Sequence, residues 1–143
     1  MNEIGDPLYR KDLLRLAADA IGAGQLEAPD ATATAHNPTC GDKVTVDLAL
    51  RGGRITAFAH RTYACVLAQA SAAILADAAP GLDRGGIAAL AANVEAMLKT
   101  GAQPPRPAYG AFDGVASHAG RHKCVLLPFE AALAALDQGK EGR

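Results

Sequence analysis

The chain has 143 residues, of which 50% are hydrophobic, and a formal net charge of −1, so we expect a single domain over residues 1–143 with its own hydrophobic core. The few basic residues are scattered, which argues against nucleic acid or an anionic membrane surface as a partner. The first 25 residues lack an apolar leader and no apolar run reaches the roughly 18 residues of a membrane span, so we expect a cytoplasmic protein.

The N-terminal segment predicts an amphipathic helix. Asp6 and Pro7 form a typical helix start, and Gly22 and Gly24 mark its end. Between them apolar residues recur at helical spacing, at Leu13, Leu16, Ala17, Ala20 and Ile21.

A β-hairpin follows a polar stretch. Apolar residues alternate with other residues from Val44 to Leu50, the pair Gly52-Gly53 marks a turn, and an extended pattern resumes from Ile55 to His60.

Two helices follow the hairpin. Residues 66–78 form an alanine-rich helix that ends before Pro80-Gly81. Asp83 is a suitable N-cap for the next helix, whose apolar positions are Ile87, Leu90, Val94, Met97 and Leu98. We expect both helices to cover one face of the sheet.

The last part of the chain predicts a long loop and a final helix. Residues 101–120 are rich in proline and glycine, and we expect this loop to border the functional site. The final helix spans about residues 121–136. Because Pro128 lies in this range, the regular helix either starts close to Pro128 or is kinked there. A polar tail begins at about residue 138. Because strands precede helices without βαβ alternation, the fold class is α+β, with helices on a small, mostly antiparallel sheet.

The three cysteines indicate the chemistry. Cys40 lies in Asn-Pro-Thr-Cys-Gly-Asp, Cys65 at the start of the alanine-rich helix, and Cys124 after Arg-His-Lys. An odd number of cysteines in a reducing compartment favours metal or thiol chemistry over disulfides. Three thiolates and the carboxylate of Asp42 form a ligand set that suits zinc or an iron–sulfur cluster. A helix start near Cys65 and Cys124 also favours their thiolate forms.

These segments resemble the NifU N-terminal domain family of iron–sulfur cluster assembly proteins, which includes IscU and SufU. The similarity rests on the Asn-Pro-Thr-Cys-Gly-Asp motif, the segment 65–72 and the segments 112–115 and 121–131, each cysteine falling in one motif in the same order. The long segment between Cys65 and Cys124 and the Arg-x-Lys-Cys sequence are closest to SufU. Where IscU proteins carry a ligand histidine directly before the third cysteine, this chain has Lys123, so His122 is left outside the ligand set.

The resemblance implies a SufE/NifU-like fold with a three-stranded sheet and a scaffold that binds zinc or a [2Fe–2S] cluster. The implied ligands are Cys40, Asp42, Cys65 and Cys124. The implied partners are a SufS-like cysteine desulfurase, which donates sulfur, and recipient apo-proteins. Cys40 is the first candidate for the sulfur acceptor, Cys65 the second and Cys124 the third.

Three other interpretations use the same cysteines. The protein could be a zinc-dependent sulfurtransferase partner of the desulfurase without a scaffold role, or a structural zinc domain, although a core of this size should not need a metal to fold. A cysteine hydrolase would use Cys124 or Cys65 as nucleophile, but no orienting residue or oxyanion motif accompanies them. Its base would be one of His36, His60, His118 and His122.

Overall fold

The sheet has three antiparallel strands in the order β1-β2-β3, within a computed structural model that describes residues 11–38 and 41–141. The strands are β1 (Ala31–Asn37), β2 (Asp42–Arg51) and β3 (Arg54–Tyr63). The predicted hairpin is confirmed as β2 and β3, and its two-residue turn places Gly52 and Gly53 at positive φ. β1 was not assigned from the sequence, because its alternation of alanine with threonine and histidine carries little hydrophobic contrast.

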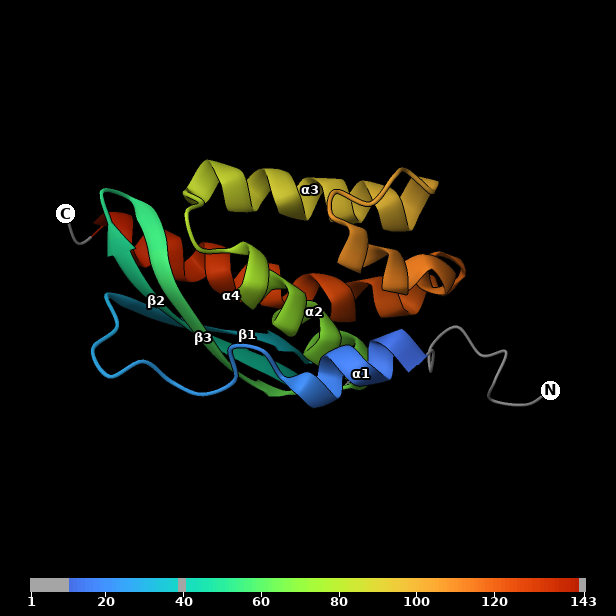
Figure 1. Ribbon diagram of the computed structural model, residues 1–143, viewed down its shortest axis with the longest axis horizontal. Coiled ribbons are helices and arrows are strands. Elements are labelled where there is room, and N and C mark those ends of the chain that lie inside the picture. Colours follow the sequence, from blue (N-terminus) through green and yellow to red (C-terminus); the bar gives the residue numbers. More distant parts are fainter. Residues whose placement is uncertain (1–10, 39–40, 142–143) are drawn as a thin grey trace.

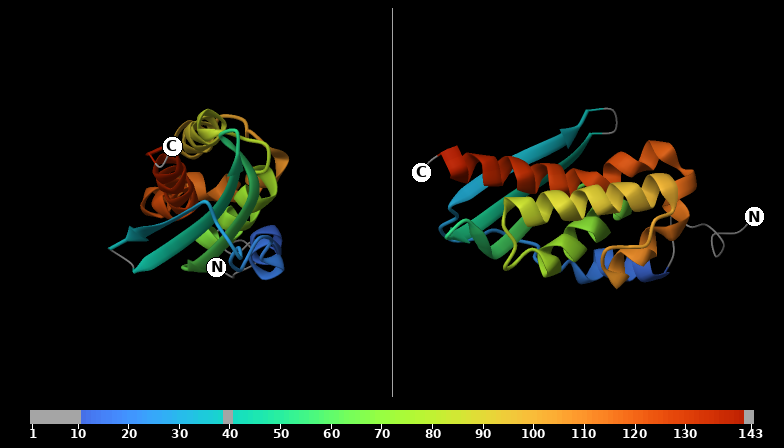
Figure 2. Two further views of the ribbon diagram at one scale, coloured as in Figure 1. Left: turned by 90° about the vertical axis from the view of Figure 1, so that its left-hand side faces the viewer. Right: turned by 90° about the horizontal axis from the view of Figure 1, so that it is seen from above.

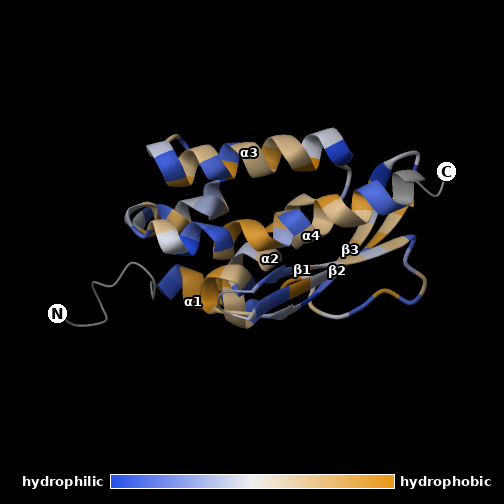
Figure 3. Ribbon diagram, turned by 180° about the vertical axis from the view of Figure 1, so that it is seen from behind, coloured by the Kyte–Doolittle hydropathy of each residue, from blue (hydrophilic) through white to orange (hydrophobic). Residues whose placement is uncertain are grey.

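The helices are α1 (Lys11–Asp19), α2 (Val66–Ala78), α3 (Arg84–Thr100) and α4 (His122–Glu141). α2 and α4 contact the sheet, and α3 packs on α4 farther from it, so the helices form two layers on the strands (Figure 1). Ten of the 13 residues of α2 are buried, whereas α3 shows mixed hydropathy along its length (Figure 3), as expected for an inner and an outer helix. The α+β class is confirmed. Within the described part of the chain, no helix combines the length and apolar character needed to cross a membrane.

Local sequence signals set most helix boundaries. Asp83 caps α3 by accepting a hydrogen bond from the Gly86 backbone N–H at 2.8 Å, as predicted. α1 ends at Asp19, followed by Ala20 at a positive φ of 50°. Ile21, which we expected on the apolar face of that helix, therefore lies outside it and is 43% exposed. The expected start at Asp6-Pro7 lies outside the described residues.

Residues 101–120 are not simply a loop. They contain the 3₁₀ helix Pro107–Ser117 and the start of a second, Ala119–Arg121. The first of them places Tyr109 and Phe112 fully in the core. The Tyr109 ring lies 6.3 Å from that of Phe112 and 6.1 Å from that of Phe129, between ring centroids. Aromatic burial rather than a site-bordering role therefore explains these two residues.

α4 is longer than predicted, because it continues to Glu141 through the expected polar tail. The Gln138 side chain accepts a hydrogen bond from the Thr32 backbone N–H, which links this part of α4 to β1. Pro128 lies inside the helix, seven residues into it, where it removes the N–H that would bond the Cys124 carbonyl.

Candidate metal centre

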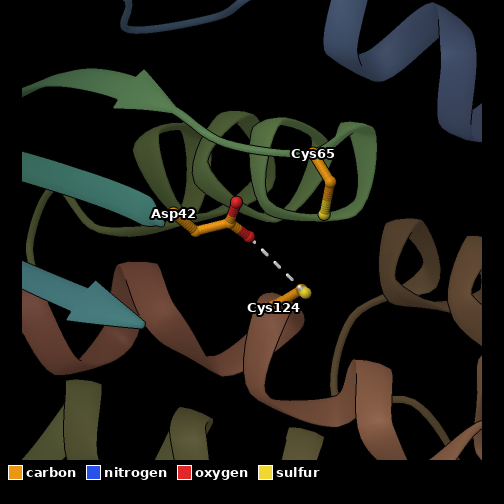
Figure 4. A group of neighbouring side chains, drawn as sticks. All are labelled: Asp42, Cys65 and Cys124. Atoms are coloured by element: carbon orange, nitrogen blue, oxygen red, sulfur yellow. Dashed lines mark hydrogen bonds between the residues drawn. The ribbon is translucent and has the colours of Figure 1, made fainter. Parts of the chain in front are cut away.

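Three of the four predicted ligands lie together, although they come from distant parts of the sequence. One ligand atom from each of Asp42, Cys65 and Cys124 lies within 4.8 Å of the other two (Figure 4). Asp42 is the first residue of β2, Cys65 immediately precedes α2, and Cys124 is the third residue of α4. The fourth predicted ligand, Cys40, lies outside the described residues.

The start of β2 places Asp42 in this cluster. Asp42 is paired with Asn37 across the two strands, at the point where β1 and β2 approach their connection. Gly41 precedes it with a positive φ of 78°, a conformation that glycine adopts at little cost. The Asp42 side chain is nearly buried, with the residue 9% exposed, and its Oδ2 accepts a hydrogen bond from the Cys124 thiol over 3.7 Å.

α2 delivers Cys65 from its N-terminus. Cys65 has an extended backbone conformation and is the N-cap residue of α2, so the first helical residue is the next one, Val66. The Gln69 side-chain amide donates to the Ala64 carbonyl at 2.9 Å, which fixes the turn that presents the cysteine. Ala64 does not have a positive φ, so alanine fits this turn without strain.

A buried hydrogen bond joins the two helices that carry the cysteines. The Ser71 hydroxyl of α2 is fully buried and donates to the Val125 carbonyl of α4, next to Cys124. Such a bond in a dry interior fixes the relative position of the two helices. Neither Ser71 nor Gln69 was assigned a role from the sequence, and their only signal was their place in the segment that follows Cys65.

The electrostatics of the cluster favour one thiolate. The Cys124 thiol stabilises a Cys65 thiolate, helped by the N–H groups of Leu67 and Ala68 at the helix start, and lowers the pKa of Cys65 to about 6. The same interaction, together with burial, raises the pKa of Cys124, because its proton is held between Cys65 and Asp42. A metal cation in place of this proton would neutralise the negative charges of the Cys65 thiolate and the Asp42 carboxylate.

The donor set fits a soft metal site. In a tetrahedral zinc site with zinc–sulfur bonds of about 2.3 Å, neighbouring ligand atoms are roughly 3.8 Å apart. The observed separations of up to 4.8 Å therefore require only a small contraction. Two thiols and one carboxylate are also the donors that hold iron–sulfur clusters and zinc rather than magnesium or calcium.

None of the predicted alternative bases joins the described ligand cluster. The His122 ring is 3.2 Å from the Ala116 carbonyl, consistent with its exclusion from the ligand set. His60 is buried between the Ile21 carbonyl and the Thr62 hydroxyl, and His118 contacts Ser117. His36 is exposed on β1. A cysteine–histidine pair for hydrolysis is therefore missing among the residues that the structure describes.

Comparison with known proteins gives a consistent result. The model of the family described as NifU-like N-terminal domain matches residues 8–108. The chain is similar to the N-terminal part of a nitrogen-fixing NifU-like protein from Brucella abortus, with 35% identity and a TM-score of 0.87 over 96% of this chain and 98% of that one. No curated protein matches the sequence.

A second solved structure shares the fold at lower identity. It is a candidate iron–sulfur cluster assembly scaffold protein for the SUF system from Fervidobacterium islandicum, with 22% identity and a TM-score of 0.81 over 92% of this chain and 98% of that one. The family match ends before Cys124, so the place of the third cysteine in the cluster comes from the fold.

Proposed function

Because this chain belongs to the family of NifU-like N-terminal domains, we propose that it is an iron–sulfur cluster assembly protein. Its site would hold a metal ion or a [2Fe–2S] cluster through Cys40, Asp42, Cys65 and Cys124. The observation that carries this proposal is the convergence of Asp42, Cys65 and Cys124 within 4.8 Å from three separate elements. A fold that needed these residues only for packing would have no reason to bring two thiols and a carboxylate to one point.

The mixed donor set suits a site that must release what it binds. Thiolates bind iron and zinc strongly, whereas a carboxylate is a harder ligand and a weaker partner for a cluster. Asp42 would therefore be the ligand that exchanges most readily. Asp42 is only 9% exposed, which limits competition from water at this ligand.

The same residues would accept sulfur from a SufS-like cysteine desulfurase. A thiolate of this chain, with Cys40 the first candidate, attacks the terminal sulfur of the persulfide on the desulfurase. A new sulfur–sulfur bond forms as the old one breaks, and the desulfurase cysteine leaves as a thiolate, so no external oxidant or reductant is needed. The cluster or the sulfur would then pass to recipient apo-proteins.

Zinc is the alternative occupant, and it would favour a sulfur acceptor without a scaffold role. Bound to the site, zinc would hold the coordinating thiols deprotonated. The three described ligands have the chemistry for either occupant. Purification without oxygen, followed by elemental analysis and a visible spectrum, separates the two, since a zinc protein is colourless and a [2Fe–2S] protein is brown.

The test of the proposal compares the parent with Cys65→Ser and Cys124→Ser. We expect the parent to bind one zinc or one cluster per chain and both variants to lose most of it, while circular dichroism stays unchanged. Ser117→Ala is a control, because it removes an exposed hydroxyl that lies outside the ligand cluster. Full metal and cluster binding by both cysteine variants would contradict the proposed site.

A further inference from the structure

The outer face of the sheet carries a row of three exposed residues beside the candidate metal centre. Lys43 of β2 lies opposite His36 of β1 and opposite Tyr63 of β3. Directly paired residues of antiparallel strands point to the same face. Because all three are exposed, this is the face turned away from α2 and α4. The adjoining ends of β1 and β2 extend away from the helices in both views of Figure 2. We call these three residues the outer row.

Tyr63 is unusually open to solvent for an aromatic residue. It is 70% exposed, more than any other large hydrophobic residue of the described chain. The Lys43 ammonium lies 5.8 Å from the centre of its ring, close enough for a cation–π contact that orients the ring. An exposed tyrosine held in one orientation is the kind of residue that anchors protein interfaces at a small entropic cost.

The outer row borders a surface hollow of about 600 Å³ that reaches the site. The hollow is also lined by Asp42, one of the candidate ligands, and by Pro38 and Gly41. These last two residues flank Thr39 and Cys40, the first candidate for the sulfur acceptor, in the sequence. A protein segment that occupied the hollow would therefore lie beside Asp42, a candidate ligand of the site.

The charge of the outer row selects an acidic partner. Lys43 forms no ion pair with a carboxylate of the described residues. On the same face, the carboxylate of Asp47 is engaged by Arg61 and by the Leu26 backbone N–H. The segment around Leu26 thus contacts the outer face at Asp47, four residues along β2 from Lys43. A carboxylate brought by a partner would meet a cation without a competing partner.

We propose that the outer row is the docking surface for the cysteine desulfurase, which contributes a segment carrying at least one carboxylate. This inference rests on the proposed function, because it assumes that the chain receives sulfur from such an enzyme. The carboxylate binds Lys43, and the rest of the segment packs on the Tyr63 ring. Docking in this position brings the persulfide to the side of the site on which the hollow opens.

The test measures the affinity of the zinc-loaded full chain for the desulfurase of the same organism. We expect Lys43→Glu and Tyr63→Ala each to weaken binding by about tenfold or more, as at interface anchors. Tyr63→Phe keeps the ring and should bind within about threefold of the parent. Arg51→Glu makes the same charge change at an exposed position of β2, roughly 26 Å along the strand, and should also bind within about threefold.

Metal content is measured for every variant, since Lys43 and Tyr63 lie near Asp42 and Cys65 in the sequence. Unchanged zinc with weakened binding supports the docking surface. Parent-like binding by Lys43→Glu and Tyr63→Ala would overturn it and leave the proposed function intact, whereas a parent that binds no desulfurase at all would overturn both. Equal weakening by Arg51→Glu would show a general charge effect and refute the surface.

The same variants distinguish the desulfurase from two other partners of this surface, a recipient apo-protein and a second copy of this chain. If Tyr63→Ala lost binding to a recipient apo-protein, or converted a dimer of this chain to a monomer, while it kept its affinity for the desulfurase, the assignment of the surface to the desulfurase would be wrong.

Discussion

Asp47→Asn should destabilise this protein far more than the loss of one surface charge would. Asp47 is 2% exposed, and its two carboxylate oxygens accept four hydrogen bonds. Oδ1 binds the Thr32 hydroxyl and one Arg61 nitrogen, and Oδ2 binds the Leu26 N–H and the other Arg61 nitrogen. Asparagine would place an N–H₂ group against two donors, whichever oxygen it replaced.

The expected loss of stability follows from these contacts. A hydrogen bond to a charged group contributes about 1.5–3 kcal/mol, and removing one member of a buried ion pair costs about 3–5 kcal/mol. The Arg61 side chain is 28% exposed, so water can partly replace its lost partner and the cost falls toward the lower end. We therefore expect Asp47→Asn to lower the free energy of unfolding by about 2–3 kcal/mol at pH 7.

The pH dependence supplies a second test. The hydrogen bonds from Arg61, followed by those from Thr32 and Leu26, lower the pKa of Asp47 below its ordinary value of 3.8 despite its burial. A lowered carboxyl pKa contributes stability that is complete above the unfolded-state pKa and is lost as pH falls through the folded-state pKa. The difference between parent and variant should thus be constant from pH 7 to about pH 5 and shrink below about pH 4.

Urea unfolding followed by circular dichroism measures both effects. Asp137→Asn is the matched control, because Asp137 pairs with Arg84 at the surface, where the two side chains are 52% and 48% exposed. Such a pair contributes less than about 1 kcal/mol. If Asp47→Asn cost no more than Asp137→Asn at pH 7, or if its cost grew as the pH fell, the assignment of this stability to a buried charged carboxylate would be wrong.

The remaining predictions concern the candidate metal centre. Asp42→Ala should make a reconstituted cluster longer-lived, because it removes the most exchangeable ligand; a faster decay of the visible spectrum than in the parent would contradict the role of Asp42. Removing the metal with a chelator should leave the circular dichroism spectrum nearly unchanged, since every α-helix and strand contributes buried apolar side chains to the core; unfolding on removal would instead indicate a structural zinc domain. Incubation with desulfurase and cysteine should place the persulfide first on Cys40, as mapped by mass spectrometry, and modification confined to Cys124 would reverse the predicted order. Gln69→Leu should reduce metal affinity by about tenfold without unfolding the protein, because it releases the turn before Cys65, and Gln69→Glu tests whether the amide N–H is the group required.

Much of this fold could be predicted from local sequence signals. Proline, glycine and capping residues mark where elements begin and end, and they act over a few residues, so they predicted α2, α3 and the β2–β3 hairpin closely. The signals failed where long-range packing decides. β1 has weak hydrophobic contrast and forms because it pairs with β2 and lies against α4. Tyr109 and Phe112 lie in a segment rich in proline and glycine, yet both are buried in the core.

The sequence by itself determined which residues have the chemistry of the site, because a thiol or a carboxylate is recognisable in any fold. It also showed that Cys65 precedes a helix, since helix starts are encoded locally. Only the tertiary structure decided that Asp42, Cys65 and Cys124 meet, because three elements must pack before atoms so far apart in the chain lie within 4.8 Å. Packing also set the two thiol pKa values in opposite directions, since each depends on a neighbour that the linear chain does not supply.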